Sequence, residues 1–216
     1  MKILIIVLSH NNDLYSKFYK SQKETWDSIN IPGIQTLYLF GNHNCDEIID
    51  DKIMVNVPET IVNNVPVNVG HKTIKSFLLT KDFDYDYIFR TNSSSYIDKK
   101  LLLDFIKDKT KNKYYSGFIG NHDKIIFASG SGFFLSKDLV EYVIEKSETW
   151  DHNLIDDVAL AYLLNTYGIS PYLNNRVDVS NDSKIPDNYF HYRLKTGDRL
   201  DDIRRMYLIY NIKNKT

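Results

Sequence analysis

Cysteine is almost absent from this sequence, and neither sign of charge prevails. Cys45 is the one cysteine among 216 residues, which excludes a disulfide framework and a Cys-type zinc site and predicts a reducing compartment. Lysine and arginine number 27 against 28 acidic residues, for a net charge of −1. A chain without excess basic charge has no field to attract a polyanion, so the composition argues against a dedicated nucleic-acid-binding protein.

Long hydrophobic runs are missing as well. The apolar run at residues 3–8 has only six members, whereas a membrane span needs about 20 and a signal peptide needs a longer run followed by a cleavage site. We therefore expect a cytoplasmic protein with no signal peptide and no transmembrane segment. The hydrophobic fraction of 43% and the length suit a single globular domain over residues 1–216.

Strand patterns alternate with helical patterns along the chain. Strands are predicted at residues 2–8, 35–40, 52–57, 87–90, 114–119, 125–128 and 189–194. Helices are predicted at residues 13–29, 67–80, 99–106, 136–147, 154–167 and 198–212, and a loop at the asparagine-rich residues 63–68. Gly168 is placed to end one helix in the left-handed conformation. This alternation predicts an α/β fold with a mostly parallel central sheet and helices on both faces.

Polar clusters follow two of the predicted strands. Ser9, His10 and Asn11 come directly after the first strand, and residues 91–95 read Thr-Asn-Ser-Ser-Ser after the strand that contains Arg90. Ligands of open α/β sheets bind at the carboxyl ends of strands, so both clusters are candidate binding segments. The second cluster is equally typical of a polar turn in which Ser and Asn bond their own backbone.

Two adjacent carboxylates open a helix that is otherwise apolar. Asp156 and Asp157 are followed by Val158 and a run rich in leucine and alanine. One interpretation is structural, because acidic residues in a first turn favour the positive end of the helix dipole. The other is catalytic, because an ionised carboxylate that projects into a cleft can act as a general base.

A glycine-rich segment, Ser129-Gly130-Ser131-Gly132, precedes the helix that begins near Ser136. Glycine lets the backbone approach a ligand closely. The segment matches neither the P-loop nor the dinucleotide-binding fingerprint, so it indicates no nucleotide-hydrolysing chemistry by itself.

The predicted strand at residues 189–194 has basic side chains. Strict alternation puts His191, Arg193 and Lys195 on one side, where three cations could hold a diphosphate. A solvated strand face is the alternative. The six histidines are scattered, and no two of them have the spacing of metal ligands.

Taken in chain order, short motifs resemble those of GT-A nucleotide-sugar glycosyltransferases, above all the beta-1,3-glycosyltransferase and Fringe group and its small viral and bacterial relatives. The matching motifs are Lys23-Glu24-Thr25-Trp26, Phe40-Gly41, Lys72-Thr73, Gly130-Ser131-Gly132 with Ser136, and Asp156-Asp157-Val158. The resemblance implies an inverting transferase that moves a sugar from a nucleotide diphosphate, most simply UDP, to a hydroxyl of a glycan or other acceptor.

The resemblance also implies a role for each candidate residue. Asp157 would be the general base and Asp156 would orient it or the sugar. The donor would be bound by Ser9, His10, Asn11, Arg90, Asn92, Ser94, His191, Arg193 and Lys195. The acceptor would be bound by Ser129, Gly130, Ser131 and Gly132. No nucleic acid is expected as a partner.

One motif departs from the family. Where the family has an acidic DxD motif, this chain has Asn92-Ser93-Ser94, which brings no charge to a cation that prefers hard oxygen ligands. We therefore expect Mn²⁺ or Mg²⁺ to bind weakly, through Asn92, Ser94 and His191 if at all, and basic side chains to stabilise the leaving diphosphate. The alternative is a non-catalytic nucleotide-sugar- or carbohydrate-binding relative that has lost the metal site.

Overall fold

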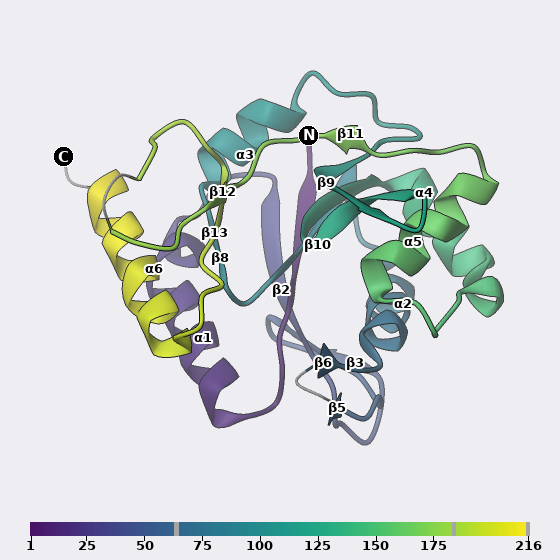
Figure 1. Ribbon diagram of the computed structural model, residues 1–216, viewed down its shortest axis with the longest axis horizontal. Coiled ribbons are helices and arrows are strands. Elements are labelled where there is room, and N and C mark those ends of the chain that lie inside the picture. Colours follow the sequence, from purple (N-terminus) through teal and green to yellow (C-terminus); the bar gives the residue numbers. More distant parts are fainter. Residues whose placement is uncertain (63–64, 183–184, 215–216) are drawn as a thin grey trace.

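A central eight-stranded sheet organises the computed structural model, which describes residues 1–62, 65–182 and 185–214. The strands lie in the order β11-β9-β10-β7-β1-β2-β4-β3 (Figure 1). Their bounds are β1 Ile3–Leu8, β2 Ile34–Phe40, β3 Glu47–Ile49, β4 Lys52–Met54, β7 Tyr87–Asn92, β9 Tyr115–His122, β10 Ile125–Ser136 and β11 Tyr172–Leu173. Two smaller sheets contain β12 Val177–Asp178, β13 His191–Arg193 and β8 Ser95–Ile97, and β5 Ile61–Val62 with β6 Val65–Pro66.

The centre of the large sheet is parallel. Strand β1 pairs in parallel with β2 and β7, and β2 with β4. Antiparallel pairs enter where β10 lies between β7 and β9 and where β3 pairs with β4. The predicted α/β fold is confirmed, and the parallel arrangement is interrupted by hairpins, which need only short connections.

Helices cover both faces of this sheet, as predicted (Figure 1). Their bounds are α1 Asp13–Glu24, α2 Val69–Thr80, α3 Lys99–Ile106, α4 Lys137–Glu145, α5 Asp156–Thr166 and α6 Arg199–Lys213, with short 3-10 turns η1 Trp26–Ser28 and η2 Ser147–Thr149. Because side chains alternate along a strand, Ile3, Ile5 and Val7 pack into one core with α1, α3 and α6. Leu4 and Ile6 pack into the other core with α2, α4 and α5.

The first helix is shorter than its periodicity predicts. It begins after Asn12, whose side chain accepts a hydrogen bond from the Tyr15 amide, and it ends at Glu24. The Thr25 hydroxyl donates to the Ser21 carbonyl at 2.6 Å, and the 3-10 turn that follows places Trp26 fully in the core. The predicted left-handed end of α5 is confirmed, because Gly168 has φ 74°.

Strand β10 is twelve residues long and continues through the glycine-rich segment, beyond the predicted strand end at residue 128. It forms a hairpin with β9 around Asp123 and Lys124, both at positive φ. The register with β9 shifts between Ala128 and Phe133. The intervening residues 129–132 form a bulge, and a bulge re-aims side chains away from the regular ladder.

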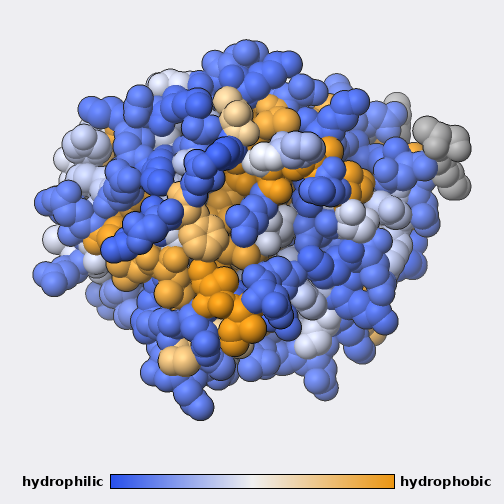
Figure 2. All heavy atoms as spheres, turned by 180° about the vertical axis from the view of Figure 1, so that it is seen from behind, coloured by the Kyte–Doolittle hydropathy of each residue, from blue (hydrophilic) through white to orange (hydrophobic). Residues whose placement is uncertain are grey.

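The surface is mainly hydrophilic. Figure 2 shows the face behind that of Figure 1, where apolar residues gather in a band surrounded by hydrophilic ones. Among the described residues, no helix is both long enough and apolar enough to cross a membrane. Of the loop predicted at residues 63–68, residues 63 and 64 lie outside the described residues, and 65–66 belong to β6.

Candidate active site

Two adjoining hollows lie at the carboxyl ends of β1 and β7, which is the lower edge of the sheet in Figure 1. Their volumes are about 140 Å³ and about 540 Å³. Both are lined by Leu8, Val67, Val69, Asn92 and Lys195, so they form one cleft. Its position is the one at which open α/β sheets bind ligands.

The acidic pair at the start of α5 lies in the larger hollow, and Arg90 of β7 lies beside it. The Arg90 side chain is only 2% exposed. Its Nη2 donates to Asp156 Oδ2 at 2.6 Å, and its Nη1 donates to the Gly130 carbonyl at 2.5 Å. Arg90 is thus committed to Asp156 and to the β10 bulge, so that the charge of Asp156 is compensated.

Asp157 is held differently. Its Oδ2 accepts from the Gly130 amide at 2.7 Å and its Oδ1 accepts from the Val158 amide at 3.0 Å. Burial, followed by the charge of Asp156, raises the pKa of the Asp157 carboxyl. The capping interpretation is insufficient, because Ile155 is the N-cap residue of α5 and Asp157 bonds across to β10. Asp157 remains a carboxylate without an ion-pair partner among the described residues.

The β10 bulge needs its glycines. A Cβ at Gly130 would lie 2.8 Å from Arg90 Nη1 and 3.2 Å from Asp157 Oδ2, and one at Gly132 would overlap the His191 ring. Ser129, Gly130 and Ser131 line the larger hollow, whereas Gly132 lines neither.

Arg176 was missed by sequence reasoning. Its Nη1 donates to the hydroxyls of Ser131 at 2.6 Å and Ser129 at 3.3 Å, and its guanidinium stacks on the Phe118 ring. It precedes β12, a strand too short for a periodic signal, and it also pairs with the nearby Asp178 at 2.6 Å, while the two serines are distant in sequence. Arg176 fixes the two serine side chains of the bulge.

The segment after β7 is a self-bonded turn. Asn92 Oδ1 accepts from the Ser94 amide at 3.2 Å and from the Ser94 hydroxyl at 3.0 Å, and the Ser93 hydroxyl donates to the Leu8 carbonyl at 2.9 Å. The polar-turn interpretation is confirmed. Asn92 and Ser94 nevertheless line the cleft, so a ligand there would meet this turn.

His191 differs from its prediction. The side chain is buried, Nε2 lies 3.1 Å from the Ser95 hydroxyl, and the ring packs edge-on against Phe89. Burial lowers the pKa of His191 to about 3, so the imidazole is neutral, and it lines neither hollow. The expectation that His191 supplies positive charge is wrong, because its ring is packed against Phe89 and against the backbone of β10 at Gly132, and not against the cleft.

Arg193 and Lys195 do line the larger hollow. Arg193 Nη1 lies 3.2 Å from Asp178 Oδ2, and its Nε is buried without a hydrogen-bond partner in the described part of the chain. Burial, together with Arg193 and Arg199, lowers the pKa of Lys195. Arg199, which the sequence reasoning did not select, lines the smaller hollow.

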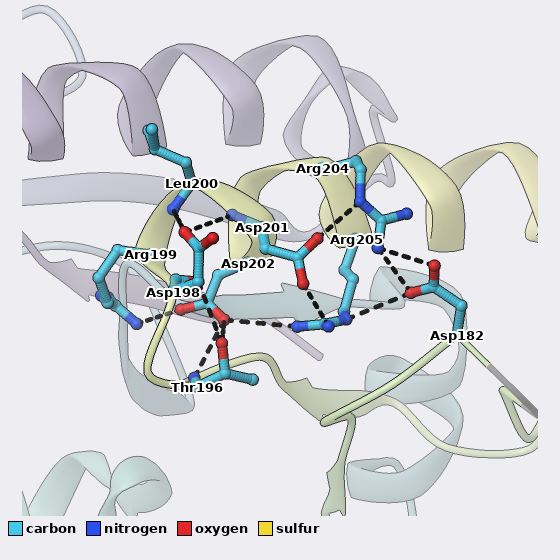
Figure 3. Close-up of polar contacts among 9 residues, drawn as sticks. All are labelled: Asp182, Thr196, Asp198, Arg199, Leu200, Asp201, Asp202, Arg204 and Arg205. Atoms are coloured by element: carbon cyan, nitrogen blue, oxygen red, sulfur yellow. Dashed lines mark hydrogen bonds and ion pairs between the residues drawn. The ribbon is translucent and has the colours of Figure 1, made fainter.

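A polar network at the start of α6 anchors this basic loop (Figure 3). Asp202 is fully buried and accepts from the Thr196 amide at 3.0 Å and the Thr196 hydroxyl at 2.7 Å, and it also pairs with Arg199. Farther along α6, Arg204 pairs with Asp182 at 2.7 Å. Because Thr196 directly follows Lys195, Asp202 holds the loop that carries the cleft-lining cations.

The smaller hollow is built around Glu59. Its carboxylate accepts from the backbone amides of Asn11 at 2.6 Å and Gly41 at 2.7 Å, and it pairs with the buried Lys72, which also donates to the Ser9 carbonyl at 2.7 Å. Ser9 and His10 line this hollow, whereas Asn11 lines neither hollow. Lys72 stood in a recognised motif, but its pairing with Glu59 has no local sequence signal.

The cleft was tested for a divalent cation. Asp156 is paired with Arg90, Glu59 with Lys72, and Asn92 Oδ1 belongs to its own turn. In residues 1–62, 65–182 and 185–214, the one group of three potential metal ligands lies outside the cleft. Mn²⁺ and Mg²⁺ prefer several oxygen ligands, and these three groups already have partners within the protein, so weak metal binding stays a prediction.

Comparisons with known proteins agree with the fold. No protein-family model and no curated protein sequence matches the chain. A solved glycosyltransferase, described as involved in the glycosylation of the major capsid of PBCV-1, is similar with a TM-score of 0.58 and 14% identity, over 96% of this chain and 100% of that one. GlyE, a glycosyltransferase of Streptococcus pneumoniae TIGR4, has a TM-score of 0.47 and 10% identity, over 80% of this chain and 45% of its own. The first similarity shows that the chain has the fold of a glycosyltransferase; membership of the Fringe group stays a prediction.

Proposed function

We propose that this protein is an inverting glycosyltransferase that moves a sugar from a nucleotide diphosphate, UDP by motif resemblance, to a hydroxyl of a glycan acceptor. The observation that carries the proposal is the different pairing of the two carboxylates of α5. Arg90 forms an ion pair with Asp156, whereas Asp157 lines the cleft without an ion-pair partner among the described residues. The fold and the position of the cleft support it. The proposed setting is the cytoplasm.

Asp157 acts as the general base. It takes the proton of the acceptor hydroxyl while that oxygen forms a bond to the anomeric carbon of the donor sugar. The bond from that carbon to the diphosphate oxygen breaks, and its electron pair leaves with the diphosphate. A single displacement inverts the anomeric carbon. Asp156, held by Arg90, restrains the position of Asp157.

The donor lies along the cleft. Its nucleoside occupies the smaller hollow against Ser9 and His10, and its diphosphate passes Asn92 and Ser94 toward Arg193 and Lys195. These two side chains, with Arg199, supply the positive charge that stabilises the leaving group. In this proposal the chain's own cations act where a bound metal acts in relatives with the DxD motif.

The acceptor enters at the far end of the larger hollow, beside Ser129, Gly130 and Ser131. These residues belong to the bulge of β10, and the Gly130 amide donates directly to Asp157. A hydroxyl bound there lies next to the proposed base.

A second candidate function is non-catalytic binding of a nucleotide sugar or carbohydrate. The observation in its favour is the turn at Asn92, which presents no carboxylate to a cation and spends its side-chain oxygen on Ser94. A chain of this kind would bind the donor without turnover.

The test is release of nucleotide diphosphate from a panel of nucleotide sugars, with binding followed in parallel. Wild type is expected to turn over at least one donor, and Asp157→Asn to lose about 10²-fold or more in turnover. Asp138→Asn is the matched control, because Asp138 lies in the first turn of α4 and lines neither hollow. Binding without turnover in wild type would favour the second candidate.

The pH profile gives an independent readout of the base. Asp157 must be ionised to accept a proton, and burial raises the pKa of its carboxyl above that of an ordinary aspartate. Activity is therefore expected to fall as the pH is lowered, at a higher pH than an ordinary aspartate would require, and to recover when the pH is raised. A profile with no loss of activity on the acid side in the folded protein would exclude Asp157 as the base.

A further inference from the structure

The loop between β2 and β3 holds three ligand-type side chains outside the cleft. Residues 43–47 read His-Asn-Cys-Asp-Glu, and His43, Cys45 and Glu47 occupy alternate positions. None of the three lines either hollow. The proposed sugar transfer therefore makes no use of them.

Both ends of this loop are fastened to strand β4 and the residues after it. The His43 amide donates to the Val55 carbonyl at 3.3 Å, and Glu47 pairs with Met54 in the β3–β4 ladder. The backbone therefore brings the side chains of His43 and Glu47 to one place, and their proximity does not depend on chance contact between flexible side chains.

The residue between Cys45 and Glu47 is turned to other partners. Asp46 Oδ1 accepts from the Asn56 amide at 2.6 Å, and Asp46 Oδ2 lies 2.7 Å from Lys75 Nζ. The Asn44 carbonyl also accepts from Asn56. The even-numbered residues anchor the loop, which leaves the odd-numbered side chains to gather on its other side.

The gathered atoms are one nitrogen, one sulfur and one oxygen. His43 Nε2 lies 2.6 Å from Glu47 Oε1, and Cys45 Sγ lies 2.9 Å from the same oxygen. All three ligand atoms lie within 4.8 Å of one another. Atoms this close need only small shifts to surround an ion with bonds of about 2.0–2.3 Å, the lengths typical of zinc.

The single cysteine excludes a zinc site built from several cysteines, but not a mixed one. We propose that His43, Cys45 and Glu47 form a binding site for Zn²⁺, with water as the fourth ligand. A mixed set of imidazole, thiolate and carboxylate suits zinc and not Mg²⁺ or Ca²⁺, which prefer oxygen alone. On binding, the thiol of Cys45 releases its proton to solvent and the two hydrogen bonds to Glu47 are replaced by bonds to the metal. The thiolate and carboxylate together balance the charge of the ion. Cys45 is exposed, so the ion has access.

The test is metal binding by the full chain, reduced, stripped with a chelator and then titrated with zinc chloride. Wild type is expected to retain one zinc per chain after gel filtration, by elemental analysis. Co²⁺ as a probe should give the near-ultraviolet thiolate charge-transfer band. Cys45→Ser should lose that band, and His43→Ala should weaken zinc binding by more than about tenfold, the loss that even outer-shell changes cause.

Asp46→Asn is the matched control, because it alters the adjacent carboxylate that faces Lys75 and should leave zinc stoichiometry unchanged. Melting curves of all variants confirm folding, since the substituted side chains lie on a surface loop. The proposal is overturned if wild type retains no zinc, if Cys45→Ser binds as tightly as wild type, or if Asp46→Asn loses the ion as fully as His43→Ala. None of these outcomes depends on sugar transfer.

Discussion

The turn after β7 and the first turn of α5 are both short polar segments at the edge of one cleft, yet they use their polar atoms in opposite ways. In the β7 turn, the Asn92 side chain bonds within the turn to Ser94, and the Ser93 hydroxyl donates to the Leu8 carbonyl at the end of the neighbouring strand β1. In α5, the two carboxylates bond to an arginine of β7 and to a backbone amide of β10. The first segment contains only neutral groups that bond to one another and to backbone carbonyls, whereas the second contains charges that need a cation and amides from other strands.

The two segments differ in the free energy needed to bury their polar groups. Neutral hydroxyl and amide groups can satisfy each other locally, and each such bond is worth about 1 kcal/mol. Two adjacent carboxylates repel each other and cannot satisfy each other. They persist near the protein interior only where a cation and backbone amides are supplied from elsewhere. Asp156 and Asp157 receive a cation and an amide from other strands, and this is the segment in which we propose the general base.

The largest effect is expected from removing Arg90, the cation that compensates Asp156. Arg90→Met leaves Asp156 without its partner and is expected to lower the free energy of unfolding by about 3–5 kcal/mol. The measurement is chemical denaturation at neutral pH. In the double variant with Asp156→Leu, the carboxylate that lost its cation is removed as well, so most of the stability should return. A single variant as stable as wild type would show that Arg90 does not compensate Asp156.

The second prediction concerns the charge that the β7 turn lacks. Since that turn has no carboxylate for a metal, Arg193→Ala is expected to cost about 2–4 kcal/mol of transition-state stabilisation, as does loss of a preorganised charge donor. Lys195→Ala should cost less, because water replaces a flexible point charge more easily than a planar fork. Activity is measured with and without EDTA and should persist after chelation.

The chelation experiment needs its own control. EDTA would also strip the proposed zinc site, so the same assay on Cys45→Ser separates the two effects. Complete loss of wild-type activity that manganese restores, with Arg193→Ala unaffected, would contradict the proposal that cations replace the metal.

The third prediction tests the link between β10 and α5. In Gly130→Ala the new methyl group would press on Arg90 Nη1 and Asp157 Oδ2, and a displaced base is expected to lower turnover by about 10²-fold. Gly197→Ala is the matched control, because a Cβ there meets nothing within 4 Å. Equal turnover in the two variants would mean that the Gly130 contact does not position Asp157.

The smallest effect on stability and turnover is expected in the turn after β7. Ser93→Ala removes the hydrogen bond to the Leu8 carbonyl and should lower the free energy of unfolding by about 1 kcal/mol. Turnover of the folded fraction should stay within about twofold. A large loss of turnover with unchanged stability would show that Ser93 acts in catalysis and not in folding. The β7 turn and α5 would then not differ in role.

Sequence patterns predicted the fold where periodicity is strong. The strand at residues 2–8 and the αL end of a helix at Gly168 were both confirmed. The pattern failed at residues 129–132, where glycine and serine resemble a loop but continue strand β10. Residues 129–132 continue the strand because β10 pairs with β7 and β9, and a short stretch of sequence does not contain those partners.

The sequence predicted individual candidate residues of the site but not the partners that position them. Asp156 and Asp157 stand out in sequence because a charged pair opens an apolar helix. Their partners, Arg90 and Gly130, are distant in sequence and were assigned to the donor and the acceptor instead. His191 was misjudged because alternation gives the side of a strand but not what covers that side.

Glu59 also joins two loops beside the cleft. One carboxylate receives the backbone amides of Asn11 and Gly41, which belong to the loops after β1 and β2. Neither loop can open by itself without leaving a buried charge short of a donor. The two amide hydrogens should therefore exchange with solvent at one common rate, through a single opening event, although Asn11 is exposed. The rim of the smaller hollow then behaves as one dynamic unit, and a ligand seated there would slow both amides together.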